Sequence, residues 1–89
     1  MIFLIHSNIS YKEQREVDFV VTRDKKPWFL IEAKKMKAPL SPQLTYFQRK
    51  TNADHAFQVS LNINFSDKNC FDYREPIHTS AASLLSQLP

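Results

Sequence analysis

The chain has 89 residues, enough for one small domain with a modest core, and its 43% hydrophobic and 24% charged residues are ordinary for a globular protein. It has no apolar run long enough to span a bilayer, so we expect no membrane partner and a cytoplasmic location. Glycine is absent, which excludes a Walker A loop and a dinucleotide fingerprint, and therefore an ATP site within this chain. The net charge of +3 permits nucleic-acid binding without arguing strongly for it.

The first half of the chain predicts three strands. Residues 2–12 are apolar and rich in residues that favour strands. Residues 16–23 and 28–35 are rich in Val, Ile, Phe and Trp, and the turn-like stretch 23–27 separates them, so we expect a hairpin. Because glycine is absent, we expect asparagine at left-handed backbone positions.

A helix is predicted after the hairpin, over about 42–51. Ser41 is placed to cap it, with Pro42 at its first position, and apolar residues follow at helical spacing. Residues 55–60 then form another predicted strand, and the alternation continues through Leu61, Ile63 and Phe65.

The last part of the chain is less regular. The stretch 70–76 is ambiguous, although Phe71 and Tyr73 would suit a short strand. Ser80 is placed to cap a last helix, whose apolar side is expected to consist of Leu84, Leu85 and Leu88. The single cysteine, Cys70, excludes an intrachain disulfide and is expected to be buried. This order of elements predicts an α/β fold, with a small mixed sheet and flanking helices.

The hairpin carries charges where a small protein tolerates them least. Side chains alternate along a strand, so an even register brings Asp18, Glu32 and Lys34 to one face. Their expected apolar neighbours are Val20, Leu30 and Trp28. An unpaired buried carboxylate is strongly unfavourable, so it usually has a partner or a metal. The two interpretations are therefore a functional site and a structural ion pair.

Such a group could hydrolyse phosphodiesters, a reaction for which proteins use a metal ion and an activated water. Mg²⁺ prefers oxygen ligands and usually takes one or two carboxylates. Asp18, Glu32 and the carbonyl of Ala33 could supply these oxygens, and Lys34 could orient the water or stabilise the developing charge.

Asp18, followed fourteen residues later by Glu32-Ala33-Lys34, resembles the signature of the PD-(D/E)XK nuclease superfamily. A closer resemblance covers nearly the whole chain. It involves residues 15–21, 30–34, 46–48, 56–59 and the tail from Pro76 to Leu85, which look like the C-terminal domain of a large prokaryotic family of AAA-type ATP-binding proteins. That domain is of unknown function and is expected to be nuclease-like.

The resemblance implies one nuclease-like domain over 1–89, with a restriction-endonuclease-like core that lacks its N-terminal helix. The chain would be the C-terminal part of a longer protein whose upstream ATPase module is a partner. It would cleave DNA with Mg²⁺ or Mn²⁺, through Asp18, Glu32 and Lys34. Candidate phosphate contacts are Lys35, Arg49 and Lys50, and candidate accessory residues are Glu16 and Gln48. A solvated face is the alternative interpretation of the three basic residues. A solvated charge and an exposed helical glutamine are the alternatives for Glu16 and Gln48.

Two other functions stay open at this point. One is a catalytically silent accessory domain that docks partners or DNA for an ATPase. The other is a fragment that folds only as an oligomer, such as a homodimer. The three histidines, His6, His55 and His78, have no metal-ligand spacing and are expected at the core edge or on the surface.

Overall fold

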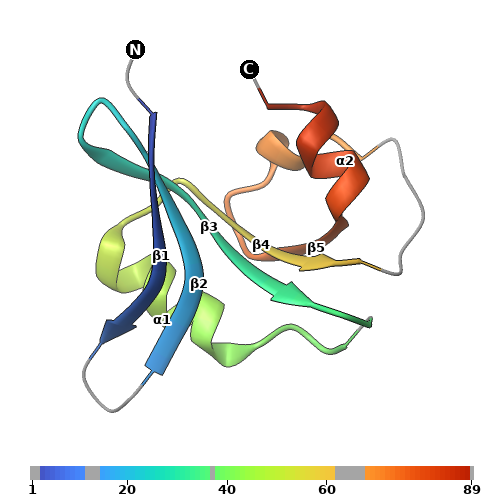
Figure 1. Ribbon diagram of the computed structural model, residues 1–89, viewed down its shortest axis with the longest axis horizontal. Coiled ribbons are helices and arrows are strands. Elements are labelled where there is room, and N and C mark those ends of the chain that lie inside the picture. The colour runs from blue at the N-terminus through green and yellow to red at the C-terminus, as the bar shows by residue number, and fades with distance from the viewer. Residues whose placement is uncertain (1–2, 12–14, 37, 62–67, 89) are drawn as a thin grey trace.

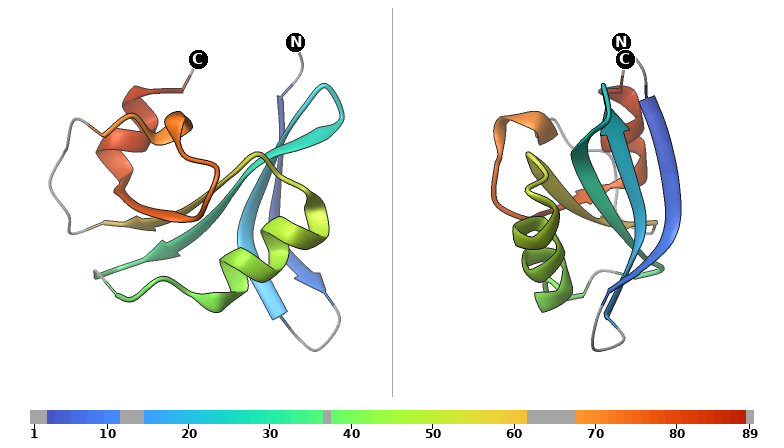
Figure 2. Two further views of the ribbon diagram at one scale, coloured as in Figure 1. Left: turned by 180° about the vertical axis from the view of Figure 1, so that it is seen from behind. Right: turned by 90° about the vertical axis from the view of Figure 1, so that its left-hand side faces the viewer.

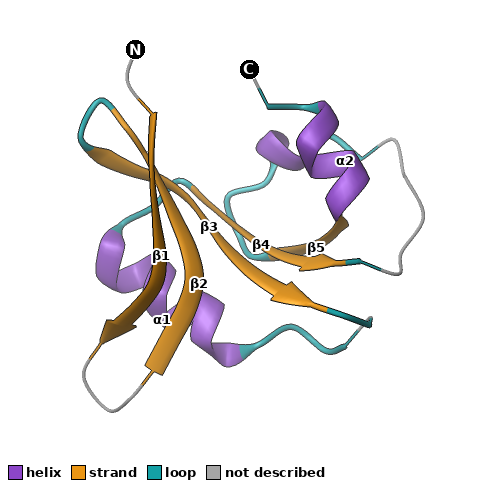
Figure 3. Cartoon of the chain, viewed as in Figure 1, coloured by secondary structure: helices purple, strands orange, loops and turns teal. Residues whose placement is uncertain are grey.

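The chain forms one five-stranded sheet with strand order β1-β2-β3-β4-β5 and two helices, as Figures 1 and 3 show. The computed structural model describes residues 3–11, 15–36, 38–61 and 68–88, and their side chains from Asp18 onward. The elements are β1 (Phe3–Tyr11), β2 (Arg15–Arg23), β3 (Lys26–Lys34), α1 (Pro42–Thr51), β4 (His55–Ser60), β5 (Ile77–Ser80) and α2 (Ala81–Ser86). None of the described helices is long and apolar enough to cross a membrane.

The sheet is mixed, which confirms the predicted α/β fold class. Strands β1, β2 and β3 pair antiparallel, whereas β3, β4 and β5 pair parallel. Helix α1 lies on the connection from β3 to β4, because parallel neighbours need a crossover connection. The carboxyl ends of three adjacent strands therefore lie along one edge of the sheet.

The predicted hairpin is confirmed, with a shorter turn than expected. Only Asp24 and Lys25 connect β2 to β3, and both have positive φ, at 52° and 70°. Positive φ at both central residues is typical of the type I′ turn, whose twist suits a two-residue β-hairpin. Asn52, with φ of 58°, is the C-cap of α1, as expected for asparagine at a left-handed position.

The expected place of Trp28 was wrong. The register runs from Phe19 opposite Ile31 to Val21 opposite Phe29, and then shifts so that Thr22 lies opposite Pro27. Trp28 is thus an extra residue on β3, and this irregularity moves its ring to the cluster that contains Phe29 instead of Leu30.

Two apolar clusters cover the two faces of the sheet. The first lies under α1, seen on one side of the sheet in Figure 2, and consists of Val20, Leu30, Leu44, Phe47, Ala53 and Ala56. The second includes Val21, Trp28, Phe29, Phe57, Val59, Cys70, Ile77 and Leu84, the last from α2. Adjacent residues of β4, such as Ala56 and Phe57, go to opposite clusters because side chains alternate along a strand. Cys70 is fully buried, as expected.

Both predicted helix caps are confirmed. The Ser41 hydroxyl accepts a hydrogen bond from the amide of Gln43 at 3.2 Å, and Pro42 begins α1. The Ser80 hydroxyl accepts one from the amide of Ser83 at 3.0 Å, at the start of α2. These caps satisfy amides that the first turn of a helix leaves unpaired.

Three expectations for the second half of the chain were wrong or lie outside the described residues. The stretch 70–76 contains a 3-10 turn, Cys70–Asp72, instead of a strand, and the last strand is β5. Leu85 is 65% exposed, so it does not belong to the apolar side of α2, whereas Leu84 is buried. Strand β4 ends at Ser60 and Leu61 is exposed; Ile63 and Phe65 lie outside the described residues.

Candidate functional site

The predicted site residues lie where β2 and β3 stop pairing. Phe19 of β2 lies opposite Ile31 of β3, and the next residues along the two strands are Asp18 and Glu32. Because side chains alternate along a strand, both belong to the face of the sheet that carries Val20 and Leu30 and is covered by α1. Lys34, two residues further along β3, follows on the same face.

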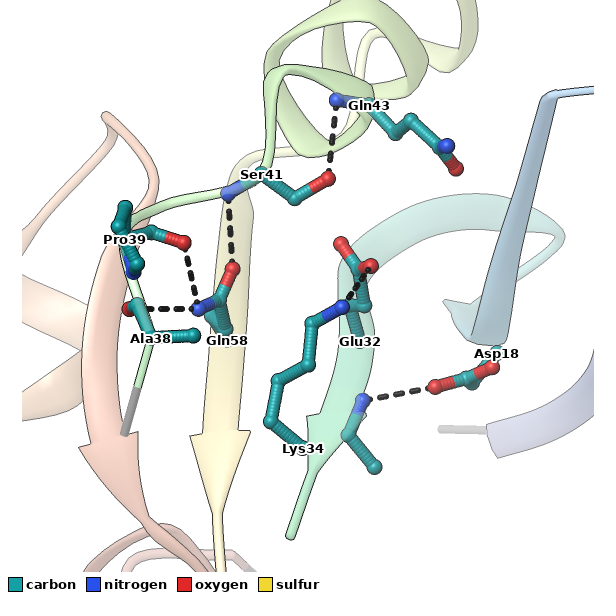
Figure 4. Close-up of polar contacts among 9 residues, drawn as sticks. Asp18, Glu32, Lys34, Ala38, Pro39, Ser41, Gln43 and Gln58 are labelled. Atoms are coloured by element: carbon teal, nitrogen blue, oxygen red, sulfur yellow. Dashed lines mark hydrogen bonds and ion pairs between the residues drawn. The ribbon is translucent and has the colours of Figure 1, made fainter. Parts of the chain in front are cut away.

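Asp18 uses its carboxylate to bind the backbone of β3. Its Oδ2 accepts a hydrogen bond from the amide of Ala33 at 2.7 Å. Figure 4 shows the Asp18 carboxylate directed at this amide and away from the carboxylate of Glu32. The Asp18 side chain therefore joins β2 to β3 beyond Phe19 and Ile31, the last pair of residues that the two backbones form.

Glu32 has two carboxylate oxygens in different situations. Oε1 forms an ion pair with the Lys34 ammonium at 3.2 Å, where the Glu32 side chain is 13% exposed and that of Lys34 is 39% exposed. Oε2 is buried and has no hydrogen-bond partner among the residues that the structure describes. Leaving a buried acceptor unpaired is unfavourable by about 1–3 kcal/mol, so this oxygen is the atom of the site that is best suited to accept a water molecule or a ligand.

Gln58 belongs to the same place, and sequence reasoning missed it. It lies directly opposite Glu32 on β4 and is fully buried. Its Oε1 accepts a hydrogen bond from the amide of Ser41 at 2.8 Å, and its Nε2 donates to the carbonyls of Ala38 and Pro39, each at 3.0 Å. Figure 4 shows these bonds holding the loop between β3 and α1 next to Glu32. In the sequence, the signal for Gln58 was a single amide side chain within the predicted strand 55–60.

The candidate phosphate contacts are divided between two places. Lys35 is exposed and directly follows β3, beside Lys34. Arg49 and Lys50 lie in the last turn of α1, roughly 10 Å along the helix from its start near Gln58. There they line a hollow of about 700 Å³ together with Tyr46, whose ring lies 5.6 Å from the Lys50 ammonium.

Of the two accessory candidates, Gln48 has its hydrogen-bond partners away from Glu32. Gln48 is half-buried, and its Nε2 donates hydrogen bonds to the carbonyls of Ala53, at 3.2 Å, and Arg74. It therefore connects the C-terminal end of α1 to the segment before β5. Glu16 lies on β2 opposite Ser10 of β1, and its side chain is outside the described part of the chain.

A divalent cation would find two carboxylates here. Among the described residues, no group of three or more His, Cys, Asp and Glu side chains is placed to hold a metal. The carboxylates of Asp18 and Glu32 come from neighbouring strands, and Glu32 Oε2 has no partner among the described residues. This donor set fits Mg²⁺ or Mn²⁺, which need only one or two carboxylates and otherwise keep water or phosphate oxygens.

Comparisons with protein-family models, with curated proteins and with solved structures gave no match. The resemblance to the nuclease-like domain therefore rests on the sequence blocks alone.

Proposed function

We propose that this domain hydrolyses phosphodiester bonds in DNA and uses a divalent cation to do so. The observation that carries the proposal is the state of Glu32. One of its oxygens is paired with Lys34, and the other is buried without a partner in the described part of the chain. A carboxylate in this state is arranged to bind a ligand as well as to balance a lysine.

The proposed ligands of the cation are Asp18, Glu32 and the carbonyl of Ala33, with Mg²⁺ or Mn²⁺ as the ion. When bound, the ion would neutralise charge on the phosphate and make an attacking water more acidic. Asp18 would keep Oδ2 on the Ala33 amide and use its other oxygen, so that β3 stays fixed during the reaction. Lys34, held beside Glu32, would orient the water or a phosphate oxygen.

The wider proposal follows the sequence resemblance. The domain would have a restriction-endonuclease-like core and would act beside the ATPase module of a longer protein. Lys35 would contact phosphate near the reacting bond, since it directly follows Lys34. Arg49 and Lys50 would bind the DNA further away, at the last turn of α1.

The experiment is a cleavage assay with plasmid, single-stranded and branched DNA, in Mg²⁺, in Mn²⁺ and with EDTA. We expect cleavage that needs the cation and falls about a hundredfold or more in Lys34→Ala and Glu32→Gln. Matched controls are Lys26→Ala, an exposed lysine at the other end of β3, and Glu75→Gln, an exposed glutamate near β5. Equal rates in all folded variants, or no cleavage by the wild type, would reject the proposal for this chain.

A second function, a catalytically silent docking domain, is favoured by the bond of Asp18. Its carboxylate satisfies a backbone amide, which is a structural task. Folded protein that binds DNA without cleaving it, with the same affinity in Glu32→Gln, would support this alternative.

A further inference from the structure

Strand β1 lies at one edge of the sheet, and its outer side has no partner strand among the described residues. It spans Phe3–Tyr11, nine residues, whereas strands in globular proteins most often have about five or six. Figure 1 shows β1 on the side of the sheet that is opposite α2. Every second residue of such an edge strand directs its amide and carbonyl outward, where another strand can bind them.

Edge strands usually carry a feature that prevents this pairing. Charged residues, proline, a bulge and a short length are common ones. The segment Phe3–Tyr11 contains no lysine, arginine, aspartate, glutamate or proline. Its pairing with β2 runs from Phe3 opposite Arg23 to Tyr11 opposite Arg15 without a shift in register. Strand β1 therefore lacks all four protective features.

The opposite edge of the sheet differs in each of these respects. Strand β5 has only four residues, Ile77–Ser80, and α2 begins directly after it. The ammonium of Lys68 donates a hydrogen bond to the carbonyl of His78 at 3.3 Å, so one backbone acceptor of β5 is occupied. An incoming strand would thus find a long row of backbone groups at β1 and a short, partly occupied row at β5.

A second copy of β1 is complementary to this edge. Antiparallel pairing of two identical strands is symmetric, so one two-fold axis satisfies both edges and closes the assembly. In the register centred on Ser7, Phe3 comes opposite Tyr11 of the partner subunit, and Ile5 comes opposite Ile9 of the partner subunit. Aromatic and β-branched residues in opposite positions favour strand pairing, and β1 brings no Asp, Glu, Lys or Arg that its own copy would repel.

We propose that β1 pairs antiparallel with β1 of a second copy of this chain, with Ser7 on the two-fold axis. The product is a homodimer in which the two five-stranded sheets form one continuous sheet. The inference is independent of the proposed function, since Asp18, Glu32 and Lys34 lie on β2 and β3 and are not part of the contact.

The first test is sedimentation equilibrium of the full chain over a range of concentrations. We expect the wild type to dimerise. Ser7→Lys places two like charges opposite each other at the axis and should weaken dimerisation about tenfold or more. The matched control is Ser86→Lys, which changes an exposed serine of α2 and should behave as the wild type. A monomeric wild type at every concentration, or an equally strong dimer in Ser7→Lys, would overturn the inference.

Mixing variants of opposite charge separates repulsion at the axis from damage to the fold. Ser7→Glu alone should also dimerise weakly, for the same reason as Ser7→Lys. An equimolar mixture of the two should associate again, because opposite charges then meet at the axis. Two folded variants that stay apart in the mixture would contradict the place of Ser7 in the contact.

A disulfide tests the register directly. Ser7→Cys adds a second thiol to a chain whose own cysteine, Cys70, is buried. Residues directly opposite each other on antiparallel strands are close enough for a disulfide, so we expect a covalent dimer under mild oxidation. Ser86→Cys is the control for random collision. Equal cross-linking in Ser86→Cys, or none in Ser7→Cys, would overturn the proposed contact.

Discussion

Glu32 and Gln58 lie directly opposite each other on the parallel strands β3 and β4, and their side chains have different partners. Gln58 holds the loop that leads into α1, whereas Glu32 pairs with Lys34 and has one oxygen without a partner among the described residues. The buried amide of Gln58 therefore fixes the loop beside Glu32 without using the Glu32 carboxylate.

Replacing Gln58 by leucine should loosen the loop before α1. The substitution keeps a similar volume but leaves the amide of Ser41 and the carbonyls of Ala38 and Pro39 without their partner. We expect unfolding in urea to show a loss of about 2–4 kcal/mol, at roughly 1 kcal/mol for each bond.

Hydrogen exchange distinguishes this local effect from a general one. The amide of Ser41 should exchange much faster in Gln58→Leu, measured under conditions where both proteins are folded. The amide of Leu30, in the middle of β3, is the reference. Unchanged protection at Ser41 would contradict the role of Gln58.

Asp18 should contribute to stability through its acceptor oxygen and not through its charge. In Asp18→Ala the amide of Ala33 loses its partner, and we expect a loss of about 1 kcal/mol, since the bond is exposed to solvent. Asp18→Asn keeps an oxygen in the same place and should lose less. If both variants unfold at the urea concentration of the wild type, the bond does not stabilise the fold.

The sequence predicted the strands of the hairpin, α1 and both serine caps because these depend on local signals. Alternation of apolar residues sets a strand, and serine before proline sets a helix start. The face shared by Asp18 and Glu32 also followed from alternation and the parity of the register.

The remaining features depend on contacts between distant segments. The shift that moves Trp28 to the other cluster is a property of pairing between two strands. The place of Gln58 opposite Glu32 exists only because β3 and β4 pair in parallel with this register. No spacing along the chain could have indicated it.

The cap of α1 gives a prediction with a rescuing control. Ser41→Ala removes the acceptor for the amide of Gln43, and we expect a loss of about 1 kcal/mol in urea unfolding. Ser41→Asp restores an acceptor and adds a negative charge at the positive end of the helix, so it should match the wild type or exceed it. A similar loss in both variants would mean that the hydroxyl acts by packing.

Two adjacent leucines of α2 should respond very differently to the same change. Leu84 is 2% exposed and packs in the cluster of Phe29 and Phe57, whereas Leu85 is 65% exposed. Leu84→Ala should therefore destabilise the domain by about 2–5 kcal/mol, and Leu85→Ala by less than about 0.5 kcal/mol. Both variants remove the same atoms from one helix, so the difference in urea midpoint reports burial alone. A large loss from Leu85→Ala would instead reveal that this side chain is covered in solution, as in a dimer, and measuring that loss at several protein concentrations would decide between the two explanations.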